Sequence, residues 1–442
     1  MAHIVSRSAY ERLTERLNRF PQGAPPSELL TRILKMLFDE KDAQRVSLLP
    51  IKPFTVETAS RIWRLPQAET RRILDRLADK ALLVDMQVHG EMKYVLPPPM
   101  AGFFEFAMMR VRTDIDQKLL AELFYEYLNV AEDFVRALFT EGETQLGRAF
   151  VDENALSETN ALFVLDWERA SEVIRTASHR GISTCYCRHK MLHLDRACDA
   201  PLDTCMTFNT AAASLIRHGH ARAVTVSECM ERLAMAREHH LVQFGENVRQ
   251  GVNFICNCCG CCCEAMLAAR RFAIMHPVHT TGFLPRVDTG SCNGCGKCVD
   301  RCPVAAMSLV SANDPHHPKR KVAQVDAERC LGCGVCLSAC TKTASLTLER
   351  RPRRVLTPLN TIHRSVIMAV ERGKLQHLLF DNRVLWHHRA LAAVVGAILR
   401  LPPVKRALAT DQSSPVIWKP WPCTILDGFV QGPISALHVH HS

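Results

Sequence analysis

Two cysteine runs with the same spacing constrain this chain more than any other feature. The segments SCNGCGKCVDRCP and RCLGCGVCLSAC place cysteines at 292, 295, 298 and 302, followed by Pro303, and at 330, 333, 336 and 340. Three cysteines at two-residue gaps wrap a loop around one side of a cube-shaped cluster and leave its fourth iron to be ligated from elsewhere. One copy would also suit tetrahedral zinc, but two adjacent copies favour iron–sulfur clusters.

The pair of runs resembles the bacterial 2[4Fe-4S] ferredoxin domain across residues 289–348. In that family the fourth cysteine of each run binds the other cluster. The resemblance implies that one cluster is held by Cys292, Cys295, Cys298 and Cys340, and the other by Cys330, Cys333, Cys336 and Cys302. Thr341 stands where the second run would have proline, so we expect the loop at that cluster to differ.

The residues between these cysteines fit a cluster-binding loop. Glycines there would let the backbone approach the sulfides and donate hydrogen bonds to them. They are Gly294, Gly296, Gly332 and Gly334. Lys297, Arg301 and Lys342 lie beside the ligands, and positive charge there favours the reduced cluster.

A second group of cysteines lies upstream and has no standard spacing. The segment STCYCRHKMLHLDRACDAPLDTC carries Cys185, Cys187, Cys198 and Cys205, and FICNCCGCCC carries six more at 256, 258, 259, 261, 262 and 263. In a reducing compartment so many thiols favour metal over disulfides or chance packing. We therefore expect a third iron–sulfur cluster, with the first four cysteines as its main candidate ligands. Two or three of the dense run would be further ligands, and the candidates are Cys256, Cys258 and Cys259.

The dense run also carries a resemblance. Cys258, Cys259 and Gly260 are similar to the CCG element of heterodisulfide reductase subunits, whose cysteines bind an active-site cluster, but the spacing around them does not complete that motif. The whole arrangement resembles uncharacterised bacterial 4Fe-4S dicluster proteins that place CYCRH and CNCCGCCC ahead of a ferredoxin domain. Because neighbouring residues rarely turn toward the same metal, we expect the remaining thiols of the run to pack or to react freely.

Residues 28–97 predict three helices and two extended arms around Gly90, with Ser27 as an N-cap. This pattern resembles a winged helix-turn-helix, whose third helix would present basic side chains to DNA. Those side chains would be Arg71, Arg72, Arg76 and Lys80. However, this segment contains twelve basic and ten acidic residues, so its net charge of +2 is small for a DNA-binding domain. We therefore predict a docking or structural role, and nucleic acid is not the expected partner.

The chain as a whole predicts an α+β fold that is mostly helical. The predicted parts are a winged-helix-like domain (1–100), a helical connector (101–182), a helical Cys-rich redox domain (183–288), the 2[4Fe-4S] ferredoxin domain (289–348), a basic helical arm (349–410) and an irregular tail (411–442). Between residues 350 and 406 the arm has twelve Lys or Arg and two acidic residues, a net charge of +10. This equals the formal net charge of the whole chain. It predicts either an acidic partner, such as a protein, a lipid headgroup or nucleic acid, or a solvated surface.

The charged N-terminus and the length of the apolar runs indicate the cellular location of the protein. The N-terminus carries charges throughout, and the longest uncharged apolar run, 390–399, is far shorter than the roughly 20 residues that span a bilayer. We therefore predict a cytoplasmic protein with no transmembrane segment.

Three functions fit these observations. The favoured one is an electron-transfer protein that passes electrons between a donor protein and an acceptor or reductase site. The alternatives are an iron–sulfur redox-sensing DNA-binding regulator and a reductase of a small thiol or disulfide. No dinucleotide or P-loop fingerprint is present, so the electrons would come from a redox partner protein. The sequence leaves the donor, the acceptor, the oligomeric state and the status as an oxidoreductase open.

Overall fold

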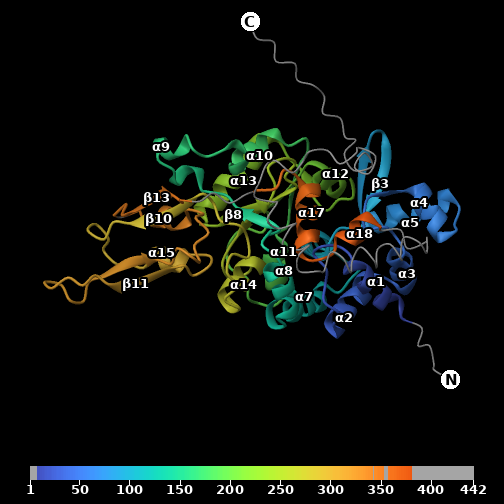
Figure 1. Cartoon of the computed structure of the whole chain (residues 1–442), viewed down its shortest axis with the longest axis horizontal. Coiled ribbons are helices and arrows are strands. Elements are labelled where there is room, and N and C mark those ends of the chain that lie inside the picture. Colours follow the sequence, from blue (N-terminus) through green and yellow to red (C-terminus); the bar gives the residue numbers. More distant parts are fainter. Residues whose placement is uncertain (1–6, 342, 353–356, 381–442) are drawn as a thin grey trace, which may run out of the picture.

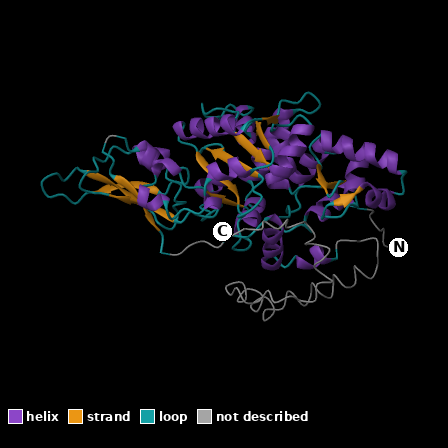
Figure 2. Cartoon of the chain, turned by 90° about the horizontal axis from the view of Figure 1, so that it is seen from above, coloured by secondary structure: helices purple, strands orange, loops and turns teal. Residues whose placement is uncertain are grey.

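The computed structural model describes residues 7–341, 343–352 and 357–380. The chain is elongated: the N-terminal helices lie at one end, a six-stranded sheet with its helices lies in the middle, and two antiparallel strand pairs form the other end (Figures 1 and 2). The predicted mixture of helices and strands is confirmed. No helix in the described ranges has the length and apolarity needed to cross a bilayer.

The N-terminal unit is helical and is closed by a small sheet. Its elements are α1 (Ala9–Leu17), α2 (Glu28–Leu37), α3 (Glu40–Ser47), β1 (Phe54–Thr55), α4 (Val56–Trp63), α5 (Gln67–Asp79), β2 (Val84–Val88) and β3 (Glu91–Val95). The strands are antiparallel in the order β1-β3-β2. The Ser27 hydroxyl accepts a hydrogen bond from the Leu30 N–H at 3.0 Å, and Gly90 makes the β2–β3 turn with φ 80°, both as predicted.

Strand β2 of this unit packs against the middle of the molecule. Asp85 on β2 accepts a hydrogen bond from the Ser214 hydroxyl at 2.7 Å and forms an ion pair with Arg217. On α5, Arg71 and Arg72 are exposed, whereas Arg76 makes a two-pronged ion pair with Asp42 at 2.6 and 2.9 Å. One of the basic side chains predicted to face DNA therefore holds α5 to α3 instead.

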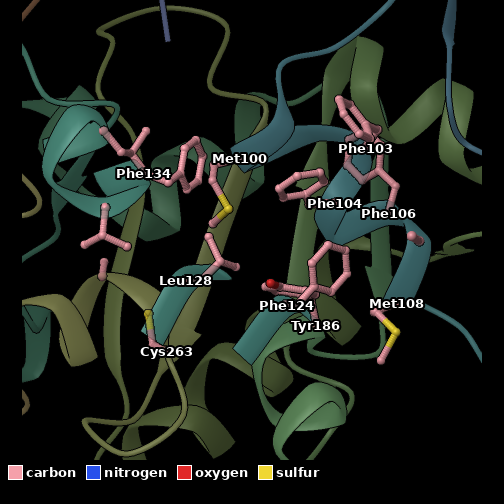
Figure 3. Packing of buried hydrophobic residues seen from close by; sticks show 14 of the residues in the cluster. Met100, Phe103, Phe104, Phe106, Met108, Phe124, Leu128, Phe134, Tyr186 and Cys263 are labelled. Carbon is pink, nitrogen blue, oxygen red and sulfur yellow. The ribbon is translucent and has the colours of Figure 1, made fainter. Parts of the chain in front are cut away.

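The connector leads into the central sheet. Its elements are η1 (Pro99–Phe103), α6 (Phe104–Met108), α7 (Gln117–Tyr125), η2 (Glu126–Val130), α8 (Asp133–Thr140), β4 (Gly147–Ala149), η3 (Glu153–Ala155), α9 (Glu158–Ala161), η4 (Asp166–Glu168) and α10 (Ala170–Thr176). The aromatic rings of Phe104, Phe124 and Tyr186 pack together, with neighbouring centroids 4.9 and 5.8 Å apart. Figure 3 shows these rings and places Cys263 at the edge of the same hydrophobic cluster, so the core reaches the thiol-rich region.

The Cys-rich middle contains helices, as expected, but it also contributes most of a sheet that was not expected. The elements are β5 (Arg180–Ser183), α11 (Tyr186–Leu192), β6 (Cys205–Phe208), α12 (Asn209–Arg217), β7 (Arg222–Ala223), α13 (Val226–Glu238), β8 (Val242–Glu246), β9 (Phe254–Cys258) and α14 (Glu264–Arg271). The strands form one antiparallel sheet in the order β4-β8-β9-β6-β5-β7, so β4 and most of β5 come from the predicted connector. The sequence did not predict this sheet because its strands are short. In β9, cysteines also occupy alternate positions where apolar residues would have indicated a strand.

The ferredoxin-like module consists of two antiparallel strand pairs and two short helices. Its elements are β10 (Phe283–Val287), α15 (Lys297–Arg301), β11 (Met307–Ser311), β12 (Lys321–Val325), α16 (Val335–Ala339) and β13 (Leu346–Arg350). The antiparallel pairs are β10–β13 and β11–β12, and each short helix follows a glycine with positive φ. The two halves therefore repeat one local design.

The basic arm begins as a packed structural segment. Its described helices are α17 (Thr361–Glu371) and α18 (Leu375–Leu379), as predicted for this stretch, and 381–442 lie outside the described residues. Arg364 pairs with Glu246 at 3.0 Å, and Arg372 donates to the Leu138 carbonyl at 2.9 Å. Lys374 donates to the Phe20 carbonyl at 3.3 Å. In the part of the arm that the structure describes, these cations bind the protein's own groups and do not form a solvated surface.

Candidate metal centres

The residues predicted to bind one cluster of the ferredoxin-like module, which we call the first ligand set, are Cys292, Cys295, Cys298 and Cys340. All four side chains line one cavity, so the fourth cysteine of the second run lies with three cysteines of the first. Cys295 is exposed, which places this set at the surface of the module. The hydroxyls of Ser345 and Thr343 lie 3.4 and 3.6 Å from the Cys340 sulfur. Although burial opposes it, these hydroxyls lower the pKa of Cys340, which favours the thiolate that binds metal.

The second ligand set is Cys302, Cys330, Cys333 and Cys336. Burial, and then the charges of Cys330 and Cys302, raise the pKa of Cys333. The backbone N–H of Ala306 lies 3.1 Å from the Cys302 sulfur, and amide donors of this kind stabilise cluster thiolates. Cys302, Cys330 and Cys336 are all buried, in contrast to Cys295 of the first set. Cys340 therefore lies with three cysteines of the first run, and the crossed ligation implied by the ferredoxin resemblance stays a prediction.

Glycines explain how the loops of the two sets pack. Gly294 and Gly332 have φ of 67° and 70°, which side chains with a Cβ rarely adopt. A Cβ at Gly294 would overlap the carbonyl oxygen of Lys321 at the start of β12, and a Cβ at Gly332 would overlap that of Phe283 at the start of β10. The same close approach therefore occurs once in each half of the module.

Six of the upstream cysteines meet at one end of the central sheet. Cys205 begins β6 one residue beyond the paired Met206 and Ile255, and so stands opposite Cys256 on β9. Cys256 and Cys258 are two residues apart on one strand and share a face. Each thiol adjoins two others in the closed order 185, 187, 263, 258, 256 and 205. We call this set the six-cysteine ring.

Electrostatics at the ring favour thiolates. Cys185 and Cys263 are the N-caps of α11 and α14, where the helix dipole stabilises negative charge. The thiols of Cys205 and Cys258 lower the pKa of Cys256 to about 5. The guanidinium of Arg188 is buried beside the ring, and it donates to the Asn257 carbonyl at 2.6 Å. Alternate thiols of the ring can thus carry the negative charge that metal ligation needs.

The other four cysteines form a separate, tighter group. Cys198 comes from the loop between α11 and β6, and Cys259, Cys261 and Cys262 come from the turn between β9 and α14. Their sulfur atoms all lie within 4.8 Å of one another. We call this set the four-cysteine group. Cys261 and Cys262 are adjacent in the sequence and yet both belong to it, because the turn at 260–262 directs both sulfurs to the same side.

The predicted third-site residues are therefore divided between two places. Cys185, Cys187, Cys205, Cys256 and Cys258 lie in the six-cysteine ring, whereas Cys198 and Cys259 lie in the four-cysteine group. Cys261, Cys262 and Cys263 were not among the predicted ligands. The alternation of 256 and 258 on a strand, followed by a tight turn at Gly260, is the sequence signal that separates the two sets.

A buried ion pair joins the helices that carry ring cysteines. Lys190 on α11 donates to Glu264 on α14 at 2.6 Å and to Asn129 on η2 at 2.5 Å. Asn129 in turn donates to Glu264 at 2.7 Å, and all three side chains are buried. The pair therefore fixes the two N-cap cysteines relative to each other.

The thiol-rich turn touches the ferredoxin-like module. A Cβ added to Gly260 would lie 2.8 Å from the carbonyl oxygen of Pro303, the residue after Cys302. The N–H of Asp152 also donates to the Cys333 carbonyl at 2.9 Å, and Thr281 donates to the Gly332 carbonyl at 2.7 Å. The second ligand set thus faces the middle of the molecule, and the first faces outward.

Comparison with known proteins identifies one domain. A family model described as a 4Fe-4S dicluster domain matches residues 291–344. No curated protein and no solved structure matches the chain. The chain therefore contains an iron–sulfur domain of the ferredoxin type.

Proposed function

We propose that the protein is an iron–sulfur electron-transfer protein in which two [4Fe-4S] clusters relay electrons between a partner protein and a thiol-ligated centre in the middle region. The observation that carries the proposal is the packing of Gly260 against Pro303. It joins the turn that follows the ring cysteines of β9 directly to the second ligand set.

The direction of the relay follows from exposure. The first ligand set has Cys295 at the surface, where a redox partner can approach. Cys302, Cys330 and Cys336 of the second set are buried, and the set packs on the middle region through Cys333 and Gly332. Clusters held by these sets would carry single electrons, and the amide of Ala306 and the hydroxyls near Cys340 would tune their potentials. Electrons would enter or leave at the first cluster and cross to the middle at the second.

We place a third iron–sulfur cluster at the six-cysteine ring. In the described residues no three ring thiols all lie within 4.8 Å of one another, a spread that suits a cluster of several irons. Arg188 and the N-termini of α11 and α14 would offset its negative charge. A cluster in this position would be either the final electron acceptor or the reaction site of an oxidoreductase.

Anaerobic purification with iron, sulfide and EPR analysis tests this function. We expect at least about eight iron and eight sulfide per chain from the module, and more from the ring. Cys258→Ser should remove only the additional iron and sulfide, whereas the matched control Cys229→Ala, a buried cysteine outside the ring, should remove none. Stoichiometric zinc without labile sulfide would overturn the proposal.

The N-terminal unit is proposed to be a winged-helix-like docking domain in a cytoplasmic protein. The strand order β1-β3-β2 and the contact of Asp85 with α12 support this role. The competing role is a redox-sensing regulator that binds DNA through the exposed Arg71 and Arg72. Electrophoretic and footprinting assays distinguish the two, because a docking domain gives no footprint at a defined operator.

A further inference from the structure

The four-cysteine group differs from the ligand sets of the module in how closely its sulfurs lie. The Sγ–Sγ distances are 3.5 Å between Cys198 and Cys259, 3.8 Å between Cys261 and Cys262, and 3.9 Å between Cys262 and Cys198. Disulfide sulfurs would be about 2.05 Å apart, so these are separate thiols. Within the described ranges, this is the one set of metal-ligating atoms gathered this tightly.

These distances match a site for one metal ion. Four thiolates at a zinc–sulfur distance of about 2.3 Å form a tetrahedron with edges of about 3.8 Å. The ligands of a cubane lie farther apart, about 6.5 Å, because four irons stand between them. We propose that the four-cysteine group binds a single tetrahedral divalent ion, zinc or iron, and does not bind an iron–sulfur cluster.

The surroundings suit the charge of such a site. Four thiolates and one divalent ion leave a net charge of −2. The buried guanidinium of Arg188 interacts with Cys259, and the guanidinium of Arg270 lies beside Gly260. Cys261 is exposed, so an ion can reach the site from solution. The site therefore has charge compensation on its inner side and an open outer side.

The ion would act by fixing the positions of two chain segments relative to each other. It joins the loop of Cys198 to a turn that lies 61 residues later in the sequence. That turn contains Gly260, which packs on Pro303. Closure of this loop by a metal would hold the ring cysteines of β9 and the second ligand set at a fixed separation.

The test uses the full-length protein purified anaerobically. Zinc, iron and sulfide are counted in the unaltered chain, in Cys261→Ser and in the control Cys229→Ala. Because Cys261 is exposed, its replacement should leave the fold intact. We expect Cys261→Ser to lose one metal ion per chain with no loss of sulfide, and Cys229→Ala to lose neither.

X-ray absorption at the zinc and iron edges of the unaltered protein identifies the ion and needs no variant. Zinc would show a single shell of four sulfurs at about 2.3 Å, and iron would appear as one ion per chain in excess of the sulfide. Loss of several irons with equal sulfide in Cys261→Ser would show a cluster and overturn the proposal. Unchanged metal in that variant, or a disulfide between Cys198 and Cys259 in anaerobic protein, would overturn it equally.

Discussion

The ferredoxin-like module and the middle region both gather cysteines, but they do so by different means. In the module, one loop supplies three cysteines of each set, and the other half of a repeated design supplies the fourth. In the six-cysteine ring, the thiols come from strand β9, the start of β6, the first turn of α11 and the N-caps of α11 and α14. A loop carries its ligands with it, whereas the ring exists only when the sheet has formed.

The largest expected effect tests how the module shares its ligands. Cys302→Ala should abolish the second cluster, with loss of about four iron and four sulfide, although Cys302 belongs to the first run. Cys298→Ala should abolish the first cluster instead. EPR of the remaining cluster distinguishes the two variants. If both variants lose the same signal, the ligands are not crossed.

A buried charge tests the dependence of the ring on packing. Lys190→Met leaves Glu264 as an uncompensated buried carboxylate and should lower the free energy of unfolding by about 3–5 kcal/mol. It should also lower the iron content of the ring and leave the module's content unchanged. Denaturant unfolding and iron analysis measure both effects.

The control for that variant is Lys297→Met in the module, because Lys297 is exposed. Its effect on unfolding should stay within about 0.5 kcal/mol. If both lysine variants lowered the free energy of unfolding by the same amount, the six-cysteine ring would not depend on buried packing more than the module does.

Gly260→Ala tests the contact between the regions. The new methyl group would press on the Pro303 carbonyl, and overpacking of this kind costs about 1–3 kcal/mol. We also expect slower reduction of the middle centre in stopped-flow measurements, with no change at the first cluster. Gly282→Ala is the matched control, since no atom lies within 4 Å of its added Cβ. An identical response of the two variants would contradict a direct path through Gly260.

The smallest effect concerns the docking of the N-terminal unit on the middle region. Although burial opposes it, the ion pair with His218 and the hydrogen bond from Ser214 lower the pKa of Asp85 to about 2, so its stabilisation is present above about pH 4 and is lost as pH falls through 2. The close contact with Asp85 raises the pKa of His218, so that contribution is complete below about pH 6.5 and is lost as pH rises through the higher folded value. Docking is therefore strongest between about pH 4 and 6.5.

Asp85→Asn should lower the free energy of unfolding by about 1–2 kcal/mol near pH 5.5 and by less near pH 8.5. Thermal unfolding at the two pH values measures the difference. The iron content of both regions should be unaffected. A loss that is the same at both pH values would exclude the Asp85–His218 pair as its cause.

The contrast also explains what the sequence can predict. The spacing around Cys292 and Cys330 determines a loop, so the ferredoxin-like domain follows from local pattern alone. The division of the upstream cysteines does not, because the partner of Cys256 is Cys205 through strand pairing, and Cys198 meets Cys259 through a loop closure. Sequence spacing carries no information on either long-range contact. The helical caps at Ser27 and the turn at Gly90 were predictable because their chemistry is local.

The scattered origin of the ring has a consequence for how the protein is made. Cys185 leaves the ribosome 78 residues before Cys263, which corresponds to roughly 4–16 s of synthesis at about 5–20 residues per second. During that interval the early thiols have no completed sheet to shield them from oxidation. A cell in which iron delivery or thiol protection lags behind translation would thus accumulate chains with a loaded ferredoxin module and an empty centre.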